Sequence, residues 1–269
     1  LGITNIGLII YIACSITGSF NKSGLSLAAI ILFTPAGFSL NKYSAEGWTI
    51  FLVLSGLALM EWDKKRNVAL TSQVTLLLGV VFYFLVLVKT QNIVLCLGLW
   101  LVFVVTHATT PLLCRTNLGF VIKKTLLLAV ISGVGLIFLL LYNHIVSDNF
   151  LKSPYDAGDA GFSMFSIRNL KLVEVLLSPW HGLLFYHPVI VFCVYYLVRG
   201  LKSVRGSDPD SRVLIIAAGL VVLVLQILMQ GSWFIWWMGT GTYGARGFVG
   251  ASLLFAYALL KSDMLKNQP

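Results

Sequence analysis

A long polar segment, residues 147–181, contains two carboxylates whose spacing could support catalysis. Asp156 and Asp159 lie three residues apart in a loop rich in glycine. Paired carboxylates can act as a general base and its orienting partner, or they can bind a divalent cation. The competing interpretation is a pair of solvated loop residues without a chemical role. We take Asp156 and Asp159 as candidate catalytic residues. A divalent cation stays open as a cofactor.

A second polar segment, residues 230–247, combines aromatic residues and glycines around one cation, Arg246. Glycine lets a ligand approach the backbone closely, and the planar guanidinium of arginine matches phosphate oxygens. We therefore expect a phosphate group to bind at Trp237, Tyr243, Gly244 and Arg246. The alternative is an ordinary belt of aromatic residues at a membrane surface, in which the arginine contacts lipid headgroups without specificity.

Shorter segments hold three further candidates. Glu46 lies near Tyr43 in a short polar stretch, where it is either a solvated carboxylate or part of a site. His181 and His187 flank residues 182–186 at the start of an apolar run. A zinc site needs a third protein ligand, and the sequence offers none with suitable spacing. We therefore predict packing or interfacial hydrogen bonding for the two histidines, and no metal site.

An unusually apolar chain must position these residues. It has 269 residues, of which 58% are hydrophobic and only 11% are charged, and its mean hydropathy is +0.90. A soluble domain of this size has no interior large enough to hide so many apolar side chains. The composition therefore argues against a soluble enzyme, a disordered protein and a nucleic-acid-binding domain. It indicates a polytopic membrane protein, whose apolar surface is covered by lipid.

Nine apolar runs are candidates for membrane-spanning helices, since about 20 apolar residues cross the roughly 30 Å of hydrocarbon. They cover approximately residues 1–18, 25–40, 48–60, 68–88, 93–106, 125–146, 182–198, 213–229 and 248–260. Helix is the expected structure, because lipid-exposed backbone must satisfy its own hydrogen bonds and the runs show no strand alternation. We therefore predict an all-α polytopic protein with about nine membrane-spanning helices, forming a single transmembrane domain over residues 1–269.

The distribution of basic residues predicts how these helices are oriented. When alternate linkers are placed on the same side, 13 of the 19 lysines and arginines fall on one side and 6 on the other. The positive-inside rule assigns the richer side to the cytoplasm. The outer face then carries residues 147–181 and 230–247, and the chain begins outside, at Leu1. Because it begins there without an initiator methionine or a cleavable signal, we expect the carboxyl-terminal part of a longer protein.

The second half of residues 147–181 can be drawn as an amphipathic helix. Apolar residues occur on one side of it and charged residues on another: Phe162, Phe165, Leu170, Val173 and Leu176 against Arg168, Lys171 and Glu174. Such a helix typically lies in the headgroup region of a membrane. We expect an interfacial helix here, with a capping helix that has no chemical role as the alternative.

Three blocks of sequence carry a family resemblance. Residues 237–246, WMGTGTYGAR, are similar to a pattern WWGGWSFGPR. Residues 178–189, SPWHGLLFYHPV, are similar to SPRRGLFVYSPV, and residues 34–46 are similar to a TPLWPYS block that is followed by a glutamate, here Glu46. In this order the blocks resemble the GT-C superfamily of membrane glycosyltransferases, near its protein O-mannosyltransferase and arabinosyltransferase-like branch. Departures such as Met238 leave the substrate open.

The resemblance implies transfer of a sugar from a polyprenyl-phosphate carrier to an acceptor hydroxyl at the outer face of the membrane. The acceptor would be a lipid, a glycan or a protein; membrane lipids are expected partners and nucleic acid is not. Such enzymes typically use an acidic base in the first outer loop, which we expect to precede Leu1. The resemblance also favours a role for Glu46 in acceptor binding or catalysis. It implies a multi-pass protein of a bacterial or archaeal plasma membrane.

Two other functions stay open. A lipid or solute transporter, or a flippase, would place charged residues in mid-membrane helices or pair broken helices with one another. The nine predicted helices carry almost no charge, and the unusual polar residues lie on one face, which favours chemistry at the surface. The remaining alternative is a membrane fragment with no activity of its own.

Overall fold

A computed structural model describes the fold over ten stretches of the chain. These are residues 1–17, 44–65, 72–108, 118–148, 150, 170–186, 190–191, 194–195, 211–232 and 246–261. Within these stretches all regular structure is helical and there is no strand. The predicted all-α class is therefore confirmed for the part of the chain that the structure describes.

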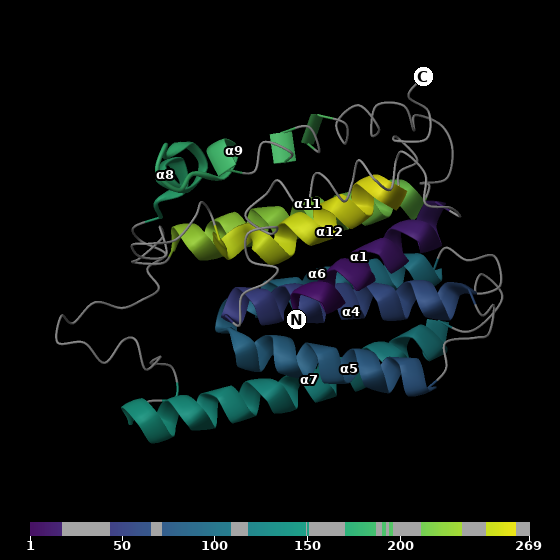
Figure 1. The fold of residues 1–269 in the computed structure, drawn as a ribbon. Coiled ribbons are helices and arrows are strands. Elements are labelled where there is room, and N and C mark those ends of the chain that lie inside the picture. The colour runs from purple at the N-terminus through teal and green to yellow at the C-terminus, as the bar shows by residue number, and fades with distance from the viewer. Residues whose placement is uncertain are drawn as a thin grey trace.

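The long helices lie alongside one another and form a bundle (Figure 1). They are α1 (Gly2–Thr17), α4 (Ala45–Lys65), α5 (Ser72–Val88), α6 (Ile93–Ala108), α7 (Leu118–Ser147), α11 (Ser211–Gly231) and α12 (Val249–Lys261). Short helices join or flank them: η1 (Thr90–Asn92), α8 (Leu172–Leu177), α9 (Leu183–Tyr186) and η4 (Arg246–Phe248). The α4 helix packs against α1, α5 and α12, whereas α7 lies at one edge and packs mainly on α5.

The bundle is held by apolar side chains that face inward from several helices. Ile50 and Leu57 of α4, Leu78 of α5 and Leu99 of α6 belong to one buried cluster. Glycine allows the closest approach: a Cβ at Gly98 would lie 2.6 Å from Val222 Cγ2. A methyl group at this point would therefore force the Val222 side chain to shift, and glycine at residue 98 lets α6 and α11 approach closely.

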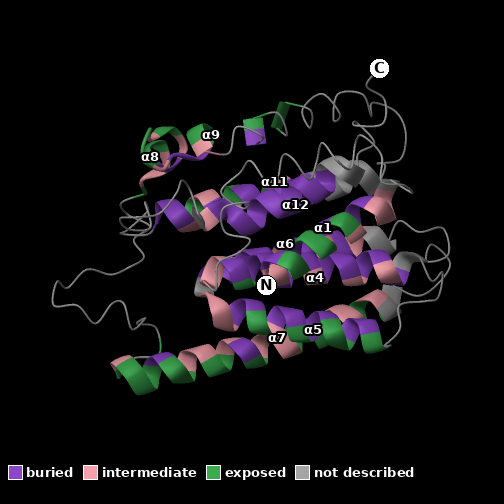
Figure 2. Cartoon of the chain, in the orientation of Figure 1, coloured by how far each residue is buried: buried purple, intermediate pink, exposed green. Residues whose placement is uncertain are grey.

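The α7 helix is the clearest candidate for a membrane span. Residues 121–147 form 27 helical residues with a mean hydropathy of 2.5, and only 11% of the apolar window is buried. Figure 2 shows exposed positions along most of its outer side. Among the described residues this is the one helix that is long and apolar enough to cross a membrane, by length and composition.

The other apolar helices in the described part of the chain are shorter. Their apolar stretches are Gly2–Ile16, Gln73–Val88, Ile93–Val105, Ala217–Gly231 and Val249–Ala258. The number of crossings, nine, therefore stays a prediction. Of the nine predicted runs, residues 25–40 lie outside the described residues, and residues 182–198 are described only in part.

Two helices differ from the sequence prediction. The α4 helix continues five residues past the predicted end at Met60, through the charged residues of its last turns. The interfacial helix predicted within residues 147–181 is described only as α8, whose single buried residue is Val175. Val173, which we placed on the apolar face, is 66% exposed, and Val175 is the residue of α8 that packs into a buried cluster.

Candidate functional site

Glu46 lies in the first turn of α4, where the backbone favours a carboxylate. The helix N-terminus carries a partial positive charge because its first N–H groups have no partner within the helix. Ser44 caps this end: the Gly47 N–H donates to Ser44 Oγ at 3.3 Å, and the Trp48 N–H donates to the Ser44 carbonyl at 3.0 Å. The cap fixes the first turn and thereby the position of Glu46.

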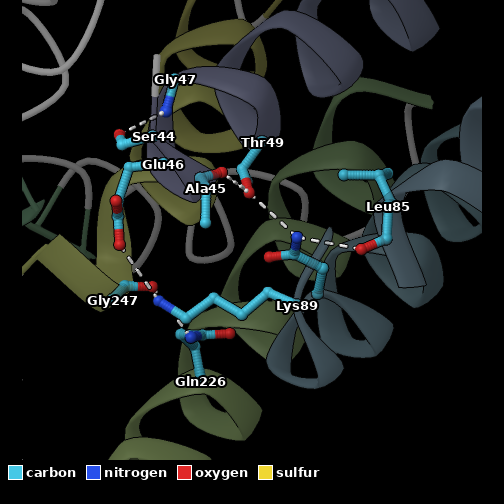
Figure 3. A network of polar contacts seen from close by, with 10 residues as sticks. Ser44, Ala45, Glu46, Gly47, Thr49, Leu85, Lys89, Gln226 and Gly247 are labelled. Carbon is cyan, nitrogen blue, oxygen red and sulfur yellow. Dashed lines mark hydrogen bonds and ion pairs between the residues drawn. The ribbon is translucent and has the colours of Figure 1, made fainter. Parts of the chain in front are cut away.

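Lys89 follows the last residue of α5 and forms an ion pair with Glu46. The Lys89 Nζ lies 3.3 Å from Glu46 Oε1, and the two side chains are 19% and 12% exposed. Figure 3 shows the lysine reaching across from its own backbone to the carboxylate. The pair joins the start of α4 to the end of α5.

Asn92, in η1, ties the same two helices together. Its Nδ2 donates to Thr49 Oγ1 at 2.9 Å and to the Leu85 carbonyl at 3.0 Å. Thr49 Oγ1 in turn donates to the Ala45 carbonyl at 2.8 Å. These bonds are drawn in Figure 3, and they make Asn92 a structural brace between α4, α5 and the start of α6.

The start of α12, which is far from α4 in the sequence, also lies beside these residues. Gly247, the residue after Arg246, accepts a hydrogen bond from Gln226 Nε2 of α11 at 2.9 Å. Gly250 lies close to Leu95, and a Cβ there would overlap the Leu95 side chain. Arg246 opens η4, and the next residue, Gly247, lines the same cleft as Glu46 and Lys89. The side chain of Arg246 lies outside the described residues.

A small cleft lies between these elements, and we call it the Glu46 cleft. It is lined by Glu46, Thr49, Lys89, Gln91, Asn92, Leu95, Gly247, Val249 and Gly250. Its empty volume is about 250 Å³, which includes space open to the outside. The N-termini of α4, α6 and α12 all contribute to this lining, the latter two through η1 and η4. Their dipoles add partial positive charge to a cleft that also contains one carboxylate.

Gln91 is the residue of the cleft that the sequence analysis did not single out. It is only 2% exposed, and within the described part of the chain neither its Nε2 nor its Oε1 has a hydrogen-bond partner. A buried polar group without a partner costs roughly 1–3 kcal/mol. The available signal was the polar stretch Lys89-Thr-Gln-Asn92 between two apolar runs, which we treated only as a linker.

The structure places one of the predicted site residues, Glu46, in the cleft. Gly247, the residue after Arg246, lines the same cleft. His181 lies elsewhere, in the turn between α8 and α9, where its ring stacks on Tyr186 with centroids 6.4 Å apart. The remaining candidates lie outside the described residues: Asp156, Asp159, His187, Trp237, Tyr243 and Gly244.

Metal ligands do not cluster in the part of the chain that the structure describes. No group of three or more histidine, cysteine, aspartate or glutamate side chains there could hold a metal ion. Because Asp156 and Asp159 lie outside that part, a divalent cation in the long polar loop stays untested.

A second buried polar cluster lies near the other end of α4. Tyr257 Oη of α12 donates to Glu61 Oε1 at 2.6 Å, and both residues are 2% exposed. Neither residue lines the Glu46 cleft. This contact joins α4 to α12 in the interior of the bundle.

Comparison with known proteins adds no relative. No protein-family model matches the chain, and neither a curated protein nor a solved structure matches it. The resemblance to membrane glycosyltransferases therefore rests on the sequence blocks alone.

Proposed function

We propose that this protein is a membrane glycosyltransferase that moves a sugar from a polyprenyl-phosphate carrier to an acceptor hydroxyl. One observation carries the proposal. The block that ends at Glu46 and the block that ends at Arg246 are far apart in the sequence, yet Glu46 and Gly247 line the same cleft. Both blocks belong to the resemblance. An ion-paired carboxylate suits a hydroxyl group, and a helix N-terminus suits a phosphate group.

The proposed chemistry uses the two sides of the cleft differently. A general base takes the proton of the acceptor hydroxyl, whose oxygen bonds to the anomeric carbon of the sugar. The bond from that carbon to the phosphate oxygen breaks, and the carrier phosphate leaves with the electron pair. Arg246 stabilises the phosphate charge, while Glu46, fixed by Lys89, accepts a hydrogen bond from a substrate hydroxyl. Among the residues of this sequence, Asp156 and Asp159 are the candidates for the base.

We also propose that the chain crosses a plasma membrane about nine times, with the Glu46 cleft at the outer face. The charge bias assigns Lys89 and Arg246 to the outside, and Lys64 and Lys65 at the other end of α4 to the inside. The contact between Lys89 and Glu46, beside the backbone of Gly247, supports a common face for these segments.

A charge placed in the middle of α7 tests the membrane assignment. Val134→Lys adds a cation near the centre of an exposed apolar helix. In lipid this costs roughly 2.5–3.5 kcal/mol, so we expect poor membrane insertion in a glycosylation-tag insertion assay. Ile145→Lys, near the helix end, is the matched control, because its side chain can reach the headgroups. If both variants insert as well as the wild type, α7 does not span the membrane.

Transfer activity tests the function directly. The full chain is reconstituted in proteoliposomes with radiolabelled sugar on a polyprenyl phosphate and with hydroxyl acceptors. We expect label in the acceptor, and a loss on the order of 100-fold in Glu46→Gln and Arg246→Ala. Glu174→Gln, an exposed carboxylate on α8, is the control that retains activity. Label that crosses the bilayer without a new bond would instead indicate a transporter, and full activity of Arg246→Ala would remove the role given to that residue.

A further inference from the structure

We infer that residues 170–186, which we call the α8–α9 segment, bind the headgroup region of the outer membrane leaflet, with Trp180 as the central anchoring residue. The inference rests on the membrane assignment of the proposed function and adds a surface that contacts lipid. The observations that carry it are the exposed apolar side chains of the segment, the fixed turn that presents Trp180, and its place at the end of the bundle where α7 ends.

The two sides of the α8–α9 segment have different surroundings. On one side, Val175 of α8 and Leu183 of α9 are each 1% exposed, and they pack in one cluster with Leu223 of α11. Away from this cluster, Val173 is 66% exposed and Trp180 is 77% exposed. Figure 2 shows exposed positions on both short helices. The segment is therefore apolar beyond the side that the bundle uses.

Hydrogen bonds fix the turn between α8 and α9. The Gly182 N–H donates to the Ser178 carbonyl at 2.7 Å, and the Trp180 N–H donates to Ser178 Oγ at 3.2 Å. Tyr186 Oη donates to the Pro179 carbonyl at 3.4 Å. Residue 182 must be glycine, because a Cβ there would overlap the Ser178 backbone. The turn thus presents Trp180 before any partner arrives, so that little order is lost on binding.

The α8–α9 segment lies at the same end of the bundle as the end of α7 (Figure 1). The Lys171 N–H donates to the carbonyl of Gly231, the last residue of α11, at 2.9 Å. Other exposed aromatic side chains belong to this end: Trp48, in the first turn of α4, and Tyr142, near the end of α7. Tryptophan and tyrosine are enriched at membrane boundaries, because each combines an apolar ring with a polar atom.

The charge on α8 favours the headgroup region over the hydrocarbon interior. Glu174 is exposed beside Val173, and Leu177 is exposed one turn later. A carboxylate among apolar side chains is costly in hydrocarbon but is tolerated where headgroups and water are close. Because lipid around the exposed apolar surface of α7 reaches this end of the bundle, it also reaches the level of Trp180.

Quenching of tryptophan fluorescence in proteoliposomes measures where Trp180 lies. The full chain has seven tryptophans, so the Trp180 emission is taken as the difference between the wild type and Trp180→Phe. The quenchers are phosphatidylcholine with bromine near the headgroup end or near the tail end of its acyl chains, and acrylamide in the water. We expect shallow bromines to quench roughly twice as much of this emission as deep bromines, since interfacial side chains lie about 5–10 Å into the headgroup boundary.

Trp100→Phe is the matched control, because Trp100 lies in the middle of α6 and its Nε1 donates to Thr125 Oγ1 at 3.3 Å. Deep bromines should quench the Trp100 emission at least as strongly as shallow ones. Trp180→Tyr repeats the difference measurement with a second side chain, and circular dichroism shows that each variant keeps its helices.

Three results would overturn the inference while leaving the membrane assignment standing, provided that α7 spans in the insertion assay. They are Trp180 emission that acrylamide quenches and bromines do not, emission that neither quenches because protein covers the indole, and stronger quenching by deep bromines. A protein that does not float with the vesicles, together with an α7 that does not span, would overturn both.

Discussion

The α4 helix carries a glutamate near each end, and the two have different surroundings. Glu61 is buried against Tyr257, with an oxygen-to-oxygen distance of 2.6 Å, in the interior of the bundle. Glu46, roughly 22 Å away along the helix at 1.5 Å per residue, pairs with Lys89 beside a small cleft. The contact of Glu61 joins two helices in the interior, whereas that of Glu46 borders a cleft open to the outside.

The polar groups at the two ends of α4 also contribute differently to the free energy of folding. The hydrogen bond between Tyr257 and Glu61 satisfies groups that would otherwise lie unbonded in an apolar interior, so it supports folding. Gln91 at the other end contributes no hydrogen bond within the described chain and costs stability. Substitutions at the two ends should therefore separate stability from ligand binding.

Tyr257→Phe should give the largest loss of stability. It removes one short hydrogen bond to a buried carboxyl group, and we expect the free energy of unfolding to fall by about 1.5–3 kcal/mol. Binding of the sugar-loaded carrier per folded molecule should not change. Denaturant unfolding in detergent measures the first quantity, and Tyr142→Phe, at a half-exposed position on α7, is the matched control. A loss of carrier binding without a loss of stability would break the comparison.

Asn92→Leu should cost about 1–2 kcal/mol of unfolding free energy. It removes the bonds to Thr49 and Leu85 that join α4 to α5, and it leaves the Leu85 carbonyl without that donor. The same unfolding measurement compares it with the adjacent Gln91→Leu, which replaces a buried amide by the same apolar side chain. Equal losses in the two variants would mean that Gln91 also braces the bundle.

Glu46→Gln should lower the free energy of unfolding by about 1–2 kcal/mol, because it leaves the mostly buried ammonium of Lys89 without its carboxylate. Its effect on transfer should be far larger, on the order of 100-fold in kcat/KM, since the carboxylate faces the reacting groups in the proposed mechanism. Parallel assays of unfolding and transfer check both values. A large loss of stability with normal transfer would move Glu46 into the same structural class as Glu61.

Gln91→Met should have the smallest effect on stability, between no change and a gain of about 1 kcal/mol. Replacing an unpartnered buried amide by an apolar side chain of similar length removes a desolvation cost and creates no cavity. The unfolding midpoint is the measurement. A fall as large as that of Asn92→Leu would show that the amide has a structural partner.

The apolar runs predicted much of the fold. The α6 helix begins at Ile93 as expected, and α5 ends at Val88 as expected, because each boundary coincides with a change from apolar to polar residues. The end of α4 differs from the predicted end at Met60. The helix continues to Lys65, and Glu61 is buried, where it accepts a hydrogen bond from Tyr257 of a distant part of the chain.

The site was predictable only in part, for the same reason. Glu46 and Arg246 stand out by residue type and by the sequence blocks that contain them. Gln91 does not, because an amide in a short polar linker is ordinary until its burial and lack of partners are known. That information arises from the packing of α4, α6 and α12 around the linker, which no local pattern encodes.

The shift in unfolding midpoint that a sugar-loaded carrier causes is the most direct test of the difference between the two ends of α4. A ligand that binds the folded state stabilises it in proportion to the logarithm of its concentration over Kd. At one fixed carrier concentration, we predict an equal upward shift in the wild type and Tyr257→Phe, and a clearly smaller shift in Glu46→Gln. An undiminished shift in Glu46→Gln, or a shift abolished in Tyr257→Phe, would contradict the account.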